Sequence, residues 1–307
     1  LKKSFAGFIS DKVPKLSGSL SYYMIFSMGP LLLIIITLCS MFLGREAIEG
    51  GIYRQLEDFT GPDTAIQLQQ IIKNASLSGK TNIATIIGVI TLLIGATSVF
   101  AEMQDSINMI WGVKAKPKKN WLKFIQDRFM SFSIIISLSF LLLVSLGISA
   151  LIESFGNYLT GRFPDVAVIV FYILNQLIII AITCFIFGIV FRVLPDAEIR
   201  WKDVIAGSVV TTILFLLGKF AISFYISKTA VGSTYGPAGA LIILIVWIYY
   251  SSIILYFGAE FTKFYALQYG APIHPSKYAV TVEQVEKETG KISIQQNEQE
   301  KELAKDK

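Results

Sequence analysis

Six apolar stretches, each long enough to cross a lipid bilayer as a helix, constrain this chain more than any other feature. A hydrocarbon core about 30 Å thick needs about 20 apolar residues at the helical rise, and irregular backbone facing lipid would leave its polar groups unpaired. We therefore predict an all-α protein, a polytopic integral membrane bundle of six transmembrane helices. The expected spans are residues 22–43, 83–101, 131–152, 166–191, 204–226 and 238–261.

The segments between and after the spans divide the chain into a membrane domain, residues 1–268, and a tail, residues 269–307. The tail is polar and rich in Glu, Lys and Gln, so it lacks the apolar surface to fold alone, and we expect it to be mobile. Amphipathic patterns predict short interfacial helices near residues 4–13 and 120–129. A helical hairpin is expected outside the membrane at residues 46–77.

The distribution of lysine and arginine predicts the orientation in the membrane. Basic residues near span ends are retained on the cytoplasmic side. They concentrate in the N-terminal arm and in the second and fourth connections, which places both termini in the cytoplasm. Because the basic residues border spans, the net charge of +5 indicates attraction to anionic membrane lipids and not to nucleic acid. The residues concerned are Lys2, Lys3, Lys12, Lys15, Lys114, Lys116, Lys118, Lys119, Lys123, Arg128, Arg192, Arg200 and Lys202.

A line of small residues along the second span leads to a carboxylate. In lipid, small residues mark the places where helices approach closely, so we expect Glu102 to face a neighbouring helix. Asp105 lies one turn further on. Glu260 ends the sixth span, which runs in the same direction, so it is expected at a similar depth near the cytoplasmic side. The line comprises Ala84, Gly88, Thr91, Gly95 and Ser98.

Further polar side chains are expected at this depth. Tyr22 and Tyr23 begin the first span, while Arg128 and Arg192 lie at the inner ends of the third and fourth. Together with the carboxylates they form a candidate substrate or ion site. The same charges can instead lock helices together or extend to the interface, so a structural role stays open.

Lys219 is an unusual residue because it lies near the middle of the fifth span. A lysine there costs about 2.5 to 3.5 kcal/mol on insertion scales, so it is expected to face the bundle and find an acceptor. By depth, the candidate partners are Asn175, Gln176 and Glu153. A stripe of hydroxyl side chains on the same face makes Lys219 a candidate for binding an anionic headgroup or solute.

Four ordered motifs are found along the chain: Ser19 to Tyr23 leading to Gly29-Pro30-Leu31, residues 95–113, residues 192–207 and residues 235–262. Together they resemble the YihY/BrkB family of bacterial inner-membrane proteins, and the likeness covers nearly all of residues 1–268. The resemblance implies a six-span protein of the bacterial plasma membrane. The family carries an old ribonuclease BN label and a virulence-factor label, but the resemblance supplies no agreed activity and no catalytic residues.

Three classes of function remain. A transporter or a protein that translocates lipids or other amphiphiles, acting on an anionic substrate, uses the intramembrane charges and is our preferred interpretation. A membrane scaffold or assembly factor for envelope proteins is the alternative. A hydrolase or ribonuclease ranks third, because the one histidine, His274, lies outside the spans and no catalytic cluster or cofactor motif is visible. We expect no enzyme activity, cofactor or metal, and leave a homo-oligomer open.

Overall fold

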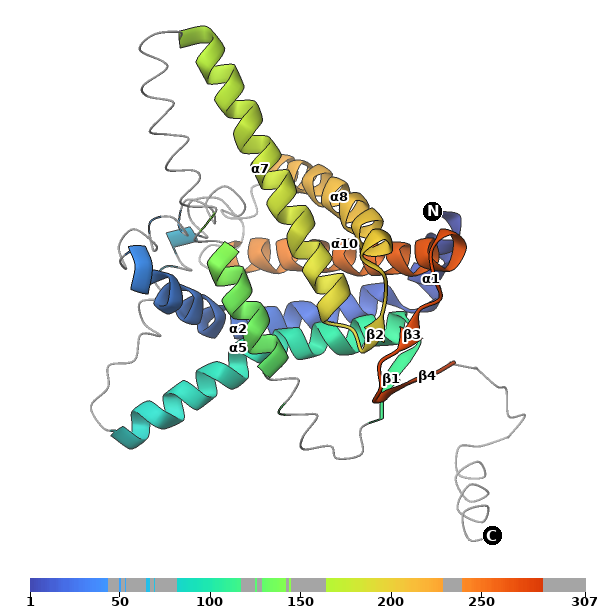
Figure 1. The fold of residues 1–307 in the computed structure, drawn as a ribbon. Coiled ribbons are helices and arrows are strands. Elements are labelled where there is room, and N and C mark those ends of the chain that lie inside the picture. The colour runs from blue at the N-terminus through green and yellow to red at the C-terminus, as the bar shows by residue number, and fades with distance from the viewer. Residues whose placement is uncertain are drawn as a thin grey trace.

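The computed structural model describes residues 1–43, 82–116, 129–141, 164–228 and 239–283, with isolated positions between them. Long helices make up nearly all of this part of the chain (Figure 1). They are α1 (Lys2–Ser10), α2 (Val13–Leu43), α5 (Asn82–Ile110), α7 (Pro164–Val193), α8 (Trp201–Lys228) and α10 (Gly239–Tyr269), with a shorter apolar helix at Phe129–Leu141. An all-α membrane protein fits this architecture.

Among the described residues, four helices are long and apolar enough to cross a membrane. The four segments correspond to the predicted first, fourth, fifth and sixth spans. The predicted second span lies within α5 and the third is described only as far as Leu141, so the count of six is not confirmed. The four segments are Val13–Cys39, Gln176–Val193, Trp201–Ile222 and Leu241–Tyr269.

Several helices continue beyond the apolar stretches that predicted them. The first span was expected to begin at Tyr22, whereas α2 begins at Val13; α5 continues past Ala101 to Ile110. Pro14 suits the first turn of α2, where a missing N–H leaves no helical bond unmade. Hydropathy detects only the part of a helix that lies in lipid, so polar turns at its ends escape the pattern.

The closest packing in the bundle joins α8 to α10. A Cβ added at Gly207 would overlap the Thr262 hydroxyl, and one added at Gly258 would overlap the hydroxyl of Thr211. The two pairs are reciprocal and four residues apart on each helix, which means that α8 and α10 run antiparallel in a fixed register. Small residues let the backbones approach this closely, as is usual where membrane helices meet.

The predicted line of small residues is confirmed as a helix contact at Gly95. A Cβ on Gly95 would lie 3.2 Å from Pro30 Cγ of α2. At the other end of α5, the Trp111 indole N–H donates to the Ala259 carbonyl of α10 at 3.1 Å. Thus α5 contacts α2 midway along its length and α10 at its C-terminal end.

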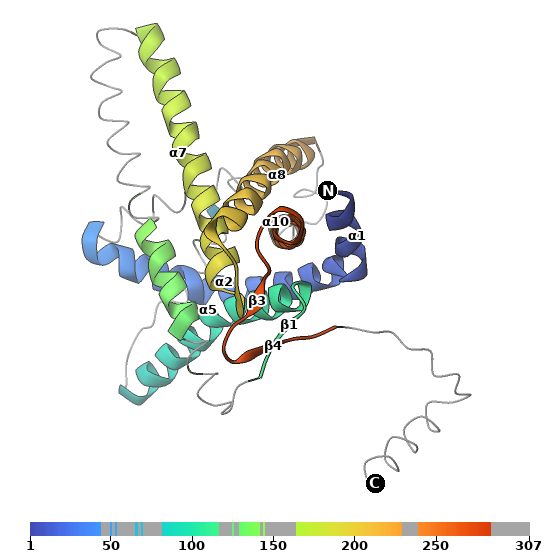
Figure 2. The same cartoon turned by 45° about the vertical axis from the view of Figure 1, so that its right-hand side comes forward.

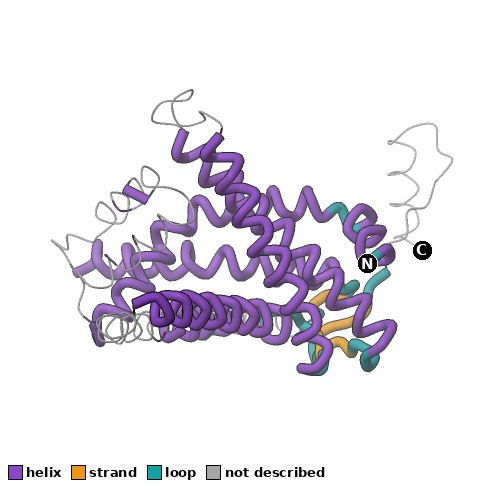
Figure 3. Tube along the Cα trace, turned by 90° about the horizontal axis from the view of Figure 1, so that it is seen from above, coloured by secondary structure: helices purple, strands orange, loops and turns teal. Residues whose placement is uncertain are grey.

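Four short strands, which the sequence did not predict, join segments far apart in the chain. β1 (Val113–Ala115) pairs antiparallel with β4 (Ala279–Thr281), and β2 (Ala197–Glu198) pairs antiparallel with β3 (His274–Pro275). Figures 2 and 3 show the strands and α1 gathered at one end of the bundle, hereafter the strand end. The part of the predicted tail up to residue 283 is therefore structured here, and residues 284–307 lie outside the described part.

The chain before α2 also folds against the strand end. A helix was expected near residues 4–13, and α1 covers Lys2–Ser10. Lys12 then takes a positive φ of 53°, which separates α1 from α2 by a sharp turn. The expected helix at 120–129 and the hairpin at 46–77 fall almost entirely outside the described residues.

Candidate functional site

Glu260 is the most deeply buried charged side chain among the described residues, with 0% of it exposed. It lies on α10 at the strand end. The Lys263 ammonium, one turn further along α10, is 3.9 Å from Glu260 Oε2 and 3.3 Å from Asp11 Oδ2 of the α1–α2 turn. One ammonium therefore lies between two carboxylates that belong to different segments of the chain.

Backbone groups close this cluster from two sides. Lys263 Nζ also donates to the carbonyl of Ile110, the last residue of α5. Gly7 of α1 lies so close that a Cβ there would be 2.7 Å from Glu260 Oε2. The cluster of Asp11, Glu260 and Lys263, hereafter the Glu260 cluster, thus joins α1, α5 and α10.

The other two acidic candidates lie on α5 and are less buried than Glu260. Glu102 is half-buried and Asp105 is exposed. Both carboxylates lie close enough to influence the buried Tyr256 of α10, which is one turn before Glu260. The structure therefore brings Glu102 and Asp105 toward the same stretch of α10, while the ion pair of Glu260 is made with Lys263.

The remaining candidates of the predicted inner cluster are spread out. Tyr22 and Tyr23 are exposed on α2, 61% and 38% respectively, and their rings contact each other edge to face. Arg192 is half-buried in the last turn of α7, where a positive charge suits the helix dipole. Arg128 lies outside the described residues. Whether any of these residues binds a substrate stays a prediction.

Lys219 is half-buried in α8 and takes part in a polar interaction. Its helix packs against α7, which carries Asn175 and the half-buried Gln176. The expected hydroxyl stripe is less available than predicted. Ser208 donates to the carbonyl of Val204, and Thr212 donates to that of Ser208, both at 2.8 Å within α8. An anion near this face would therefore depend on the Lys219 charge.

The sequence did not predict a second buried polar cluster. Asp196, 3% exposed, follows α7 and accepts hydrogen bonds from the side-chain amides of Asn108 at 2.9 Å and Gln104 at 3.3 Å. Asn108 Oδ1 accepts the Asp196 N–H at 2.8 Å in return. The sequence did contain a signal for this cluster, because the amide side chains of Gln104 and Asn108 are four residues apart and so share one face of a helix. These bonds satisfy the buried carboxylate, and the cluster fixes α5 to the α7–α8 turn.

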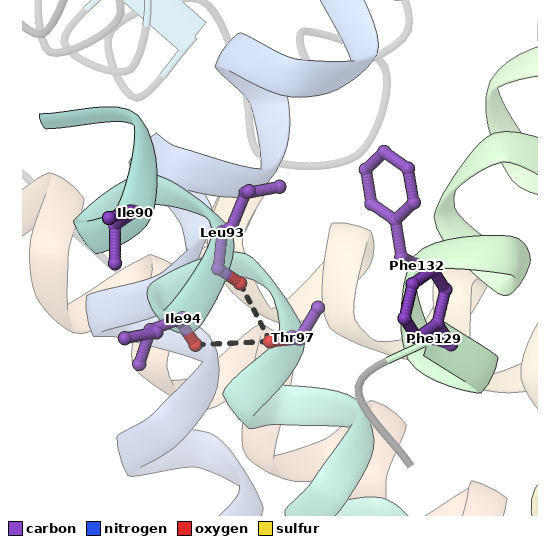
Figure 4. Close-up of a pocket in the computed structure, with 6 residues that line it drawn as sticks. All are labelled: Ile90, Leu93, Ile94, Thr97, Phe129 and Phe132. Atoms are coloured by element: carbon purple, nitrogen blue, oxygen red, sulfur yellow. Dashed lines mark hydrogen bonds between the residues drawn. The ribbon is translucent and has the colours of Figure 1, made fainter. Parts of the chain in front are cut away.

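An apolar groove lies between α5 and the helix Phe129–Leu141 (Figure 4). Its volume is about 390 Å³. Ile94 and Phe129 are 50% and 69% exposed, so the groove is open toward the surroundings of the bundle. The Thr97 hydroxyl donates to carbonyls of its own helix, which leaves an almost purely apolar surface. The lining residues are Ile90, Leu93, Ile94, Thr97, Phe129 and Phe132.

Comparison with known proteins agrees with the membrane architecture. A UPF0761 membrane protein of Tolumonas auensis is 28% identical, with 82% of this chain and 80% of the relative covered. One of Pseudoalteromonas atlantica is 26% identical over 82% and 81%. A protein of Bacillus subtilis named ribonuclease-like protein YfkH is 24% identical over 85% and 92%. No solved structure matches. The family model described as virulence factor BrkB matches residues 4–280, and the chain therefore belongs to the BrkB family of membrane proteins.

Proposed function

We propose that this protein translocates an anionic amphiphile, such as a lipid with an acidic headgroup, across the bacterial inner membrane. In this proposal six helices span the membrane and both termini lie in the cytoplasm. The strand end, which holds the N-terminal α1, then faces the cytoplasm. Lysines and arginines of the N-terminal arm and of the second and fourth connections support this orientation.

The observation that carries the proposal is the apolar groove between α5 and the helix Phe129–Leu141. A groove of about 390 Å³ is within the usual size range of small-molecule sites, and its apolar lining suits a hydrocarbon chain better than a polar solute. Because Ile94 and Phe129 are largely exposed, a chain can enter from the side of the bundle without passing through water. The lysine in the middle of α8 supports a negatively charged headgroup.

Lipid translocation in liposomes with a fluorescent phosphatidylglycerol tests the proposal. Ile94→Trp would fill the groove, and we expect it to slow translocation several-fold while the protein keeps its melting temperature. Ile136→Trp is the matched control, because Ile136 is 44% exposed on the neighbouring helix and does not line the groove. Equal rates for both variants would argue against the groove as a lipid path, and no translocation by the wild type would favour the scaffold.

A further inference from the structure

We propose that the Glu260 cluster is a proton-binding site in which Glu260 holds the proton and α1 is the lid. The proposal does not depend on what the protein translocates. It follows from the charge count, the hydrogen bonding and the packing around Glu260.

The charge count shows why the site needs a proton. With Glu260, Asp11 and Lys263 all ionised, two negative charges face one positive charge, so one negative charge is uncompensated. Burying an unpaired ion costs several kcal/mol, because the charge loses its hydration without gaining a partner. The ammonium already occupies the place between the carboxylates, which disfavours a metal ion there. A single proton neutralises the excess.

Hydrogen bonding identifies Glu260 as the group that holds this proton. Neither carboxylate oxygen of Glu260 has a hydrogen-bond partner among the described residues, although the side chain is completely buried. The Lys263 ammonium is 3.9 Å from Glu260, beyond hydrogen-bond range, and at 3.3 Å it is closer to Asp11. The ammonium therefore compensates the charge of Asp11 more than that of Glu260. Glu260 is the carboxylate that protonation stabilises more.

The partly exposed residues give the proton a route from water. The side chains of Lys263 and Asp11 are 21% and 25% exposed, whereas Glu260 is 0% exposed. A proton taken up from water by the Asp11 carboxylate passes to a Glu260 oxygen when a movement of the α1–α2 turn brings the two carboxyls within hydrogen-bond distance. An O–H bond breaks on Asp11 and another forms on Glu260, and Lys263 stays an ammonium beside both.

Helix α1 covers Glu260, and the contact is closest at Gly7. Ser4 and Gly7 are the buried residues of α1, and Gly7 leaves no room for a Cβ between its backbone and the Glu260 carboxylate. The turn at Lys12, with its positive φ, joins this helix to α2 and allows it to act as a separate unit. A proton from water therefore has two routes to Glu260. Either α1 moves away and water reaches the carboxylate, or Asp11 takes up the proton and passes it on.

The other charged and titratable groups around the site belong to α1, α2 and α5. Helix α5 contributes Glu102 and Asp105, which act on Tyr256 one turn away, in addition to the Ile110 carbonyl. On α1 the lysines Lys2 and Lys3 are exposed, as are Lys12 at the turn and Lys15, Tyr22 and Tyr23 on α2. Asp11 and Lys263 are therefore the groups whose removal should alter the titration of Glu260 most.

Infrared difference spectroscopy of the protein in lipid nanodiscs, titrated from acid to alkaline pH, tests the site directly. We expect the wild type to show the carbonyl band of a protonated buried carboxylic acid, which disappears as pH rises. Glu260→Gln should remove this band. Glu198→Gln is the control, because Glu198 is an exposed carboxylate on β2, and it should keep the band. A band that persists in Glu260→Gln would overturn the proposal.

Two variants at the partly exposed positions test the site without altering its buried residue. Asp11→Asn leaves one carboxylate opposite one ammonium, so the titration midpoint should fall by about one pH unit. Lys263→Gln removes the ammonium that lies between the two carboxylates and should raise the midpoint by a similar amount. Shifts in the same direction, or no shift, would refute the site.

The lid is tested by two alanine substitutions of glycine. Gly7→Ala should push α1 away from Glu260, admit water and lower the midpoint. Gly18→Ala is the matched control, since a Cβ at Gly18 meets nothing within 4 Å, and it should leave the midpoint unchanged. An unchanged midpoint in Gly7→Ala would show that α1 is not the lid. All these measurements are spectroscopic, so their outcome does not depend on whether the protein translocates lipids.

Discussion

Replacement of Gly207 by alanine is expected to destabilise the bundle although alanine favours helices. The new Cβ would overlap the Thr262 hydroxyl and lie 2.8 Å from Thr262 Cβ. Thr262 is completely buried, and its hydroxyl donates to the Gly258 carbonyl at 2.7 Å, so it cannot turn away without losing that bond. Overpacking costs about 1 to 3 kcal/mol, against a helix-propensity gain of about 1 kcal/mol. We expect a net loss of up to about 2 kcal/mol in the free energy of unfolding.

Reversible unfolding in mixed micelles measures this loss. Gly18→Ala, which gains helix propensity and meets no neighbour, should instead stabilise the protein by about 0.5 to 1 kcal/mol. Thr262→Ala should relieve part of the Gly207→Ala defect, since the hydroxyl and methyl are removed while the Cβ stays, giving a coupling of about 1 kcal/mol. Equal effects of the two glycine substitutions, or no coupling, would refute the proposed register of α8 and α10.

Two further predictions concern Lys219 and the topology. Lys219→Gln should keep the melting temperature but slow translocation of an anionic lipid, and Lys219→Arg should retain part of the rate because the charge persists; a normal rate in the glutamine variant would exclude a binding role. Cysteines introduced at positions 74 and 229 should react with an impermeant reagent in intact cells, and cysteines at 118 and 288 should not, because basic connections stay in the cytoplasm. Labelling at 118 would reverse the orientation.

The apolar parts of the helices could be predicted from the sequence because burial in lipid acts on each helix separately. Which helices pack against each other could not be predicted, because a small residue indicates a close contact but not the helix on the other side of it. Gly95 was recognised as a contact residue, but its neighbour Pro30 became evident only in the structure. The Gly207 and Thr262 contact shows the same limit, because neither residue indicates that the other lies opposite it.

The candidate site was predicted in part for a related reason. Glu260 stood out as a carboxylate at the end of a span, and the structure buries it completely. Its partners Asp11 and Lys263 were not among the predicted site residues. They become part of the site because α1 folds back against α10, and this tertiary contact leaves no local pattern. Asp196 was hidden similarly, since its amide partners belong to another helix.

The strand pairs at the strand end have a consequence for biogenesis. Translation produces β1 and β2 before β3 and β4, so the first two wait without partners while α10 is still being synthesised and inserted. Helices can enter the bilayer one after another, but the strand end can be completed only after β3 and β4, as far as residue 281, have emerged. A chain that stops before residue 274 would keep its inserted helices and expose two strand edges, each able to pair with a strand of another chain.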